Sequence, residues 1–313
     1  MRRRLRAWGM ARAGLATRLD LAQGLLDVGG LHRTYSLARP REVAAGVLVV
    51  LHGGGASGAG MAALTGLAER APRAGFAAVF PDGWNHVWND RRDASALAHR
   101  ERIDDAAFID ELIDHVATEG VAEGSVVFAV GISNGAFLAE YLARHALAPL
   151  AGIGLVAGTA TVVSRESEPR PRQPATVVMF HGTADPLVPY GGGPIGPIGR
   201  HAQRGAGPRG RGTRDRGEAV AAEVVAADWA AANGCSSEPT VDQLPASDGD
   251  RAVTRMRWSA PAGSDVLLHR IEGGGHTWPG GAQYLPERFV GPVARNLDAT
   301  GIMLQVFSAV ARR

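Results

Sequence analysis

Several short stretches of the chain are apolar almost throughout and rich in β-branched residues. A strand with one exposed face alternates apolar and polar residues, so uninterrupted runs predict strands that are buried on both faces. Segments with helical spacing lie between them, and this alternation is typical of an α/β fold with a mostly parallel sheet and helices on both faces. We expect strands at 31–37, 46–51, 75–80, 126–130, 153–156, 175–180 and 266–271, and helices at 61–71, 104–118, 302–310 and from 137 onward.

The turns that follow these runs hold most of the residues that can carry chemistry. In sheets of this kind, ligands bind outside the carboxyl ends of the strands. Glycine-rich or polar turns follow the runs at 52–58, 81–83, 131–135, 181–185 and 272–276. We therefore expect a functional site at that edge of the sheet.

The length of 313 residues fits one α/β domain with additions. We expect an N-terminal arm at 1–28 and a single α/β domain at 29–313 that carries an insertion at 191–217, rich in Gly, Pro and Arg. The insertion cannot bury enough apolar surface to order itself, which favours a surface insertion over an anion-binding or substrate-gating loop. The net charge of +2 is too small to indicate nucleic acid as the main partner.

No stretch of the sequence is long and apolar enough to predict a transmembrane segment. The N-terminus begins with a positive cluster, but Arg12, Arg18 and Asp20 interrupt any run of signal-peptide length. The expected location is therefore cytoplasmic, unless the start is misassigned. Cys235 is the single cysteine, so no internal disulfide can form.

Ser133 is the candidate nucleophile. It lies in a G-x-S-x-G motif between an apolar run and a segment with helical spacing, which is the context of a nucleophile elbow. The serine of such a turn has a strained backbone, and the flanking glycines remove side chains that would clash there. The alternative is an ordinary turn between a strand and a helix.

A serine nucleophile needs a base and a group that orients the base. In α/β-hydrolases the order along the chain is serine, acid, histidine. His276 follows the last strand and is the candidate base, and Asp185 lies between it and Ser133 as the candidate acid. Other residues fit less well: His52, His181 and His269 lie in His-Gly turns or inside a strand, and Asp82 and Asp90 precede the serine.

The loop at 52–55 reads His-Gly-Gly-Gly, a pattern that supplies one N–H group of an oxyanion hole. We expect the donors to be the N–H groups of Gly54 and Asn134, the latter being the residue after the nucleophile. A phosphate-binding loop is the alternative, but the lysine of a P-loop and the spacing of a dinucleotide motif are both lacking.

Aromatic residues gather near the same edge and are candidates for contacts with a substrate. Trp278 is two residues from the candidate base, Tyr190 follows the candidate acid, and Trp84 and Trp88 follow the third strand. Simple packing is the alternative for each of them.

The motifs together resemble those of the polyhydroxybutyrate depolymerase-like esterases, a family that includes feruloyl and acetyl-xylan esterases. They read LHGGGASG at 51–58, PDG at 81–83, WND at 88–90, GISNG at 131–135, HGTADPLVPY at 181–190 and GGGHTWPG at 273–280. The resemblance covers roughly residues 31–310. It implies an α/β-hydrolase serine esterase in which Ser133, Asp185 and His276 match the family triad.

The chain departs from that family in four respects. Family members are usually exported, and they often pair the cysteine equivalent to Cys235 with one before the last strand, where this chain reads Ser-Ala-Pro-Ala-Gly at 259–263. Ala136 stands where a second glycine usually follows the elbow, and the arginine-rich insertion looks peculiar to this chain.

The sequence thus predicts a carboxylic-ester hydrolase that works through an acyl-enzyme, with no metal or organic cofactor. The resemblance implies as substrate either a hydroxyalkanoate oligomer or an aromatic or acetyl ester of a polysaccharide. Two alternatives remain open: acyl transfer to an alcohol on the same fold, and a non-catalytic protein that binds polyester or glycan.

Overall fold

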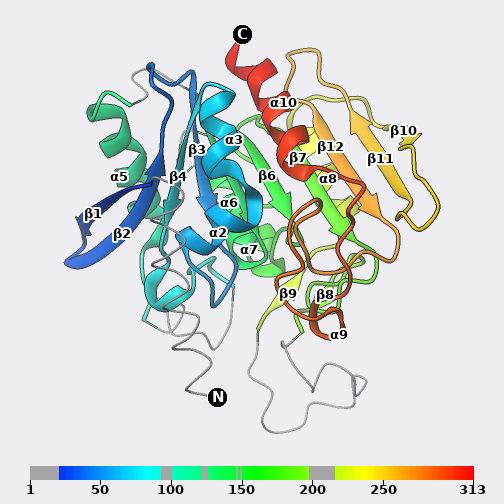
Figure 1. Cartoon of the computed structure of the whole chain (residues 1–313). Coiled ribbons are helices and arrows are strands. Elements are labelled where there is room, and N and C mark those ends of the chain that lie inside the picture. Colours follow the sequence, from blue (N-terminus) through cyan, green and yellow to red (C-terminus); the bar gives the residue numbers. More distant parts are fainter. Residues whose placement is uncertain (1–20, 93–100, 122–125, 146, 149, 197–215) are drawn as a thin grey trace, which may run out of the picture.

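The computed structural model describes residues 21–92, 101–121, 126–145, 147–148, 150–196 and 216–313. Ten strands form one sheet in the order β1-β2-β4-β3-β5-β6-β7-β12-β11-β10 (Figure 1). The strands are β1 (Ala22–Val28), β2 (Leu31–Ala38), β3 (Gly46–Leu51), β4 (Phe76–Pro81), β5 (Val126–Ile132), β6 (Leu150–Val156), β7 (Thr176–Gly182), β10 (Thr240–Gln243), β11 (Val253–Trp258) and β12 (Val266–Ile271). The described helices are α2 (Gly58–Thr65), α3 (Leu67–Arg73), η1 (Trp84–His86), α5 (Asp105–Thr118), α6 (Asn134–Arg144), α7 (Val162–Ser167), α8 (Ala222–Ala232), α9 (Glu287–Val290) and α10 (Ala299–Ala311).

The centre of the sheet is parallel and its two margins are antiparallel. Strands β4, β3, β5, β6, β7 and β12 run parallel to one another, whereas β1, β2, β10 and β11 pair in the antiparallel sense. The expected α/β-hydrolase fold with a mostly parallel sheet is confirmed. The carboxyl ends of the six central strands share one edge, where the candidate residues lie.

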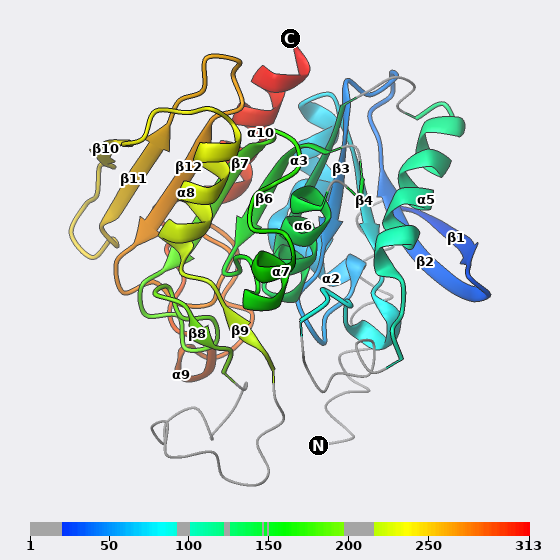
Figure 2. The ribbon, with the colours of Figure 1, turned by 180° about the vertical axis from the view of Figure 1, so that it is seen from behind.

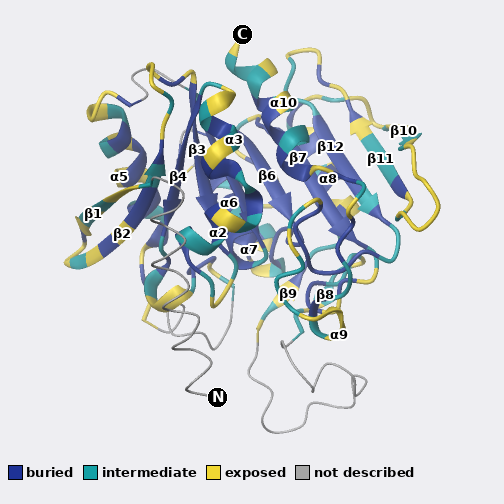
Figure 3. Cartoon of the chain, viewed as in Figure 1, coloured by how far each residue is buried: buried dark blue, intermediate teal, exposed yellow. Residues whose placement is uncertain are grey.

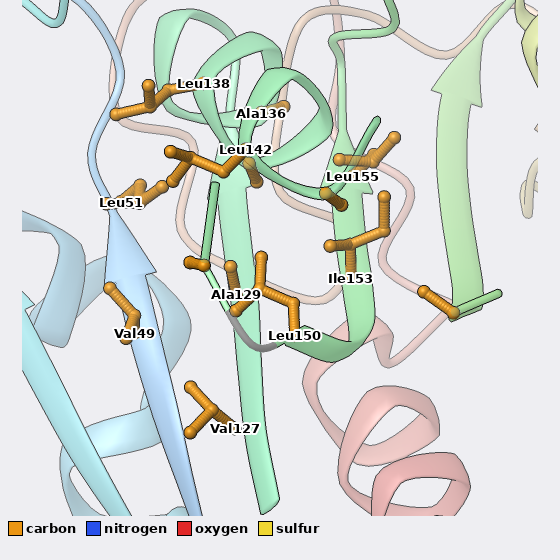
Figure 4. Packing of buried hydrophobic residues seen from close by; sticks show 14 of the residues in the cluster. Val49, Leu51, Val127, Ala129, Ala136, Leu138, Leu142, Leu150, Ile153 and Leu155 are labelled. Carbon is orange, nitrogen blue, oxygen red and sulfur yellow. The ribbon is translucent and has the colours of Figure 1, made fainter. Parts of the chain in front are cut away.

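Helices cover both faces of the sheet. Helices α2, α3 and α10 lie on one face, and α5, α6 and α8 lie on the other, which Figure 2 shows from behind. The central strands are buried from end to end (Figure 3) because they pack against both layers. Around β5, Val127 and Ala129 pack with Leu138 and Leu142 of α6 (Figure 4). This packing fixes the strand that ends at Ser133.

The expected arm at 1–28 is corrected in part. Residues 1–20 lie outside the described residues, but residues 22–28 form strand β1, which pairs with β2 along its whole length. Its side chains are mostly exposed, so the apolar periodicity that marks a buried strand is lacking. The expected helix at 61–71 is two helices, because Gly66 has a left-handed backbone with φ of 65° and ends α2.

The expected insertion at 191–217 lies mostly outside the described residues. Its two ends are held together by a short antiparallel pair, β8 (Gly193–Pro194) with β9 (Glu218–Ala219). Cys235 follows α8, and its thiol lies 3.9 Å from the carbonyl oxygen of Ser264, just before β12. None of the described helices is both long and apolar enough to cross a membrane.

Candidate active site

Ser133 occupies the sharp turn between β5 and α6. Its backbone has φ of 56° and ψ of −122°, a conformation that a residue with a side chain rarely adopts. Hydrogen bonds hold the turn, since the Ser133 N–H donates to the Val156 carbonyl (3.0 Å) and the Ser133 carbonyl accepts from the N–H of Phe137 (3.0 Å). Strain of this kind persists only where the surroundings impose it, and it is concentrated at functional sites.

The glycines of the motif are required by close approach of the backbone. A Cβ atom on Gly131 would overlap the backbone of Gly135, and one on Gly135 would overlap the carbonyl of Leu51. The elbow is therefore wedged between the end of β3 and its own helix. This agrees with the expectation that the flanking glycines remove side chains that would clash in the turn.

Asp185 and His276 form a buried pair. The His276 Nδ1–H donates to Asp185 Oδ2 at 2.8 Å, while Asp185 Oδ1 accepts from the N–H groups of Leu187 (2.8 Å) and Val188 (2.9 Å). Burial alone would raise the pKa of Asp185, but His276 and the neighbouring donors outweigh burial and hold it below its usual value. The carboxylate is thus ionised and aimed at the imidazole.

Backbone bonds join the turns at this edge of the sheet. The Ala157 N–H donates to the Phe180 carbonyl (3.0 Å), and the Ala184 N–H donates to the Gly274 carbonyl (3.0 Å). His276 is held further by Tyr284, whose hydroxyl donates to the His276 carbonyl at 2.7 Å. Sequence reasoning missed Tyr284, because it lies in a loop without periodicity or a motif.

Among the described residues, the Ser133 hydroxyl makes no hydrogen bond to His276. Contacts of this type are often long in the free protein and shorten when substrate binds. The side chain of Ser133 is partly exposed, and the His276 ring is almost fully buried.

The expected oxyanion donors lie next to the nucleophile. A Cβ atom on Gly53 would be 3.5 Å from the Cβ of Ser133, and one on Gly54 would be 3.8 Å from that of Asn134. Within the described part of the chain, the N–H groups of Gly54 and Asn134 have no hydrogen-bond partner, the latter because it opens a helix. Both can therefore donate to an anionic oxygen.

His52 supports this loop and does not act as a base. Its Nε2 accepts from the Gly83 N–H (2.9 Å), so the proton is on Nδ1, which donates to the Gly53 carbonyl (2.8 Å). The His52 carbonyl accepts from the indole N–H of Trp88 at 2.8 Å. These bonds fix the loop that carries Gly54.

The side chain of Asn134 has a role that sequence reasoning missed. Its Oδ1 accepts from the Trp88 N–H (2.7 Å), and its Nδ2 donates to the Trp88 carbonyl (3.1 Å) and to Asp90 Oδ2 (2.8 Å). Asp90 is in turn paired with Arg92 at 2.9 Å. The WND motif at 88–90 was the part of the sequence that could have indicated this role, because its residues bond to the side chain of Asn134, the first residue of α6.

Comparison with known proteins decides the family. The family model for phospholipases and carboxylesterases matches residues 32–194. The protein named "Putative esterase NocK" from Nocardia uniformis subsp. tsuyamanensis is 30% identical over 252 residues, which is 80% of this chain and 70% of that protein. The chain belongs to the phospholipase/carboxylesterase family of α/β-hydrolases. It is a carboxylesterase, which is a coarser statement than the resemblance to polyhydroxybutyrate depolymerase-like esterases.

The fold of this carboxylesterase has a solved counterpart. Acetyl xylan esterase from Aspergillus awamori superposes with a TM-score of 0.54 over 82% of this chain and 94% of its own, at 14% sequence identity. At that identity the likeness shows the fold alone.

Two of the four expected aromatic contacts need correction. Trp88 and Trp278 are 0% and 1% exposed, and the Trp278 indole N–H donates to the Thr300 hydroxyl at 3.0 Å. Both rings are packed inside the protein and present no surface to a ligand. The sequence placed them correctly near the edge, but proximity along the chain does not reveal which way a ring points.

Tyr190 and Trp84 are partly exposed. The Tyr190 hydroxyl donates to Glu223 at 2.7 Å, and its ring stands edge-on to His181 at 5.8 Å between ring centres. Trp84 belongs to the wall of a hollow of about 440 Å³. Its other walls include Thr34, Ser57, Asp82 and His86. None of Ser133, Asp185 and His276 lines this hollow, which adjoins the loop at 52–55 through the Gly55 N–H, a donor to the His86 carbonyl at 2.7 Å.

Proposed function

We propose that the carboxylesterase is a serine hydrolase that works through an acyl-enzyme, with Ser133 as nucleophile, His276 as general base and acid, and Asp185 as the group that orients His276. Ser133 Oγ attacks the ester carbonyl carbon while His276 Nε2 takes its proton. The carbonyl oxygen becomes an oxyanion and accepts from the N–H groups of Gly54 and Asn134. His276 then protonates the leaving alcohol, and the acyl group stays on Ser133.

The second half of the reaction reverses these roles with water. His276 takes a proton from a water molecule, whose oxygen attacks the acyl carbon. Collapse of the second tetrahedral intermediate returns the proton to Ser133 and releases the carboxylic acid.

The observation that carries the proposal is the conjunction of the strained Ser133 turn with the buried pair of His276 and Asp185 at 2.8 Å, both at one edge of the sheet. The combination of φ of 56° and ψ of −122° lies outside the regions that an ordinary turn allows a serine. The His276 and Asp185 side chains are both almost fully buried, as a pair that serves a reaction requires. The two unpaired N–H groups beside Ser133 supply the third requirement of acyl transfer.

The test is hydrolysis of p-nitrophenyl acetate by Ser133→Ala and by wild type. We expect a loss of kcat of at least about 10³-fold, because removal of any triad member leaves only the residual catalysis from binding and the oxyanion hole. The matched control is Ser237→Ala, which replaces an exposed serine after α8. Unchanged kcat in Ser133→Ala would refute the nucleophile.

For the ester, we propose an aromatic or acetyl ester of a polysaccharide over a hydroxyalkanoate oligomer. The polar hollow that Trp84 lines supports this choice. Asp82 accepts from the Thr34 hydroxyl (2.9 Å) and the Gly58 N–H (2.8 Å), and Trp84 adds a flat ring. A sugar has hydroxyl groups and an apolar ring face, and it suits such a wall better than an aliphatic polyester does. The solved neighbour named as an acetyl xylan esterase has the same fold.

Acetylated xylan oligomers, methyl ferulate and hydroxybutyrate oligomers should be compared side by side, with products separated in the presence of an added alcohol. We expect the highest kcat/KM for a carbohydrate ester and free acid as the main product. Trp84→Ala should lower kcat/KM for that ester and leave p-nitrophenyl acetate unaffected. Preference for the hydroxybutyrate oligomer would overturn the substrate proposal, and dominant transfer to the alcohol would make the protein an acyltransferase.

A further inference from the structure

His181 is a second buried histidine beside the candidate acid. It lies at the end of β7, and its side chain is 1% exposed. The His181 Nε2–H donates to the Val188 carbonyl at 2.8 Å, and the same nitrogen lies 3.7 Å from Asp185 Oδ2. The reaction described above does not use this ring.

The contacts define the charge and the tautomer of His181. A carbonyl can only accept, so the proton is on Nε2, while Nδ1 has no partner among the described residues. Burial lowers the pKa of His181 and keeps the ring neutral. The groups that face it are Asp185, His276 and the ring of Tyr190, over which the guanidinium of Arg270 lies at 5.7 Å.

Val188 is held from two sides in this arrangement. Its N–H donates to Asp185 Oδ1, and its carbonyl accepts from His181. The His181 ring therefore holds the turn that surrounds the carboxylate, and its Nε2 lies 3.7 Å from the oxygen that binds His276. Because the ring is neutral, it does not compete with a protonated His276 for the charge of Asp185.

We propose that His181 is a positioning residue that acts through Asp185. The inference rests on the proposed function, because it assigns His181 a role in orienting the acid that serves His276. Without His181, the 185–188 turn loosens and Asp185 holds the protonated base less firmly. The barrier then rises, and the base accepts its proton only at lower pH.

The test compares His181→Met, which has no donor, with His181→Gln, whose amide nitrogen reaches the position of Nε2. His269→Met is the matched control, because His269 is equally buried on the neighbouring strand β12 and bonds to the Met179 carbonyl (3.1 Å). We expect His181→Met to lower kcat for p-nitrophenyl acetate about tenfold, the equivalent of one hydrogen bond. KM should stay within about twofold, since no substrate contact is lost.

The pH profile separates positioning from simple stability. In His181→Met the acid limb of kcat/KM should move to lower pH, and in His181→Gln it should return toward wild type. His269→Met should lose thermal stability without any movement of the limb. An unmoved limb in His181→Met, or an equal movement in His269→Met, would overturn the inference.

A double-mutant cycle tests whether the effect passes through the acid. In an Asp185→Asn background, His181→Met should lower kcat less than about twofold further, because residues that act as a unit are not additive. A full tenfold loss in that background would contradict the inference. Ser133→Ala keeps the two proposals distinct: full activity there refutes the nucleophile, whereas a dead Ser133→Ala with a normal His181→Met refutes only the role of His181.

Discussion

The buried ring of His269 should make the stability of the protein depend steeply on pH. It lies on β12, stacked on Phe180 at 4.4 Å between ring centres, and burial lowers its pKa from 6.5 to about 4. Above pH 6.5 the ring is neutral in both the folded and the unfolded chain. Between pH 6.5 and about 4 the unfolded chain takes up a proton that the folded chain refuses, so stability falls as the pH falls.

The size of the effect follows from the shift. A difference of about 2.5 units corresponds to roughly 3 kcal/mol at pH values below 4, at about 1.4 kcal/mol per unit. Between pH 7 and pH 5, the part of the window that most assays reach, the loss is about 2 kcal/mol. A protein of ordinary stability, about 5–15 kcal/mol, would register that loss clearly.

The perturbation is His269→Asn, whose amide nitrogen takes the position of Nδ1 and can still donate to the Met179 carbonyl. Urea unfolding at pH 7, 6 and 5 gives the free energy of unfolding of both proteins. We expect the variant to be less stable at pH 7, because it loses the stacked ring, and the difference from wild type to shrink by about 2 kcal/mol at pH 5. All other titrating groups, His181 included, are common to both proteins and cancel. Parallel curves for the two proteins would refute the reasoning.

Three further predictions concern close packing and buried polar contacts. Gly135→Ala should destabilise the fold by about 1–3 kcal/mol by chemical denaturation, because its Cβ would overlap backbone, whereas Gly191→Ala, in open space, should be neutral. Arg144→Met should cost about 3–5 kcal/mol because it leaves the fully buried Glu140 unpaired, and a double variant that also replaces Glu140 with Leu should recover most of that loss. Trp278→Phe should lower the melting temperature, since one buried hydrogen bond is lost, with KM for p-nitrophenyl acetate unchanged. A raised KM in the Trp278 variant would instead support the original prediction that Trp278 contacts the substrate.

The central strands were predictable because burial on both faces leaves a direct mark on the sequence. Strands β3 and β12 begin and end where the apolar runs do. Strands β10 and β11 and helix α8 were not predicted. Strand β10 is mostly exposed and β11 is buried only at its two end residues, so neither forms an apolar run.

The sequence was enough to predict which residues form the candidate site, but not how their side chains are oriented. Chain order and strand ends selected Ser133, Asp185 and His276, since their placement depends on the topology of the sheet. Orientation was not predictable, because it depends on packing between residues far apart in sequence. The Trp278 ring turns toward Thr300 of α10 for that reason.

Four buried histidines near the sheet show how partners assign different roles to one residue type. Both ring nitrogens of His52 are bound, one to an N–H and one to a carbonyl, so the ring can only brace the loop. His181 and His269 each donate to a backbone carbonyl, which determines the nitrogen that carries the proton but does not stabilise a positive charge on the ring as a carboxylate would. His276 alone among them donates to a carboxylate that is itself held by backbone donors, and its Nε2 makes no hydrogen bond within the described residues. A ring that can stabilise a positive charge on one side and accept a proton on the other is what a general base requires, and this contrast with its three neighbours is why we assign the base to His276.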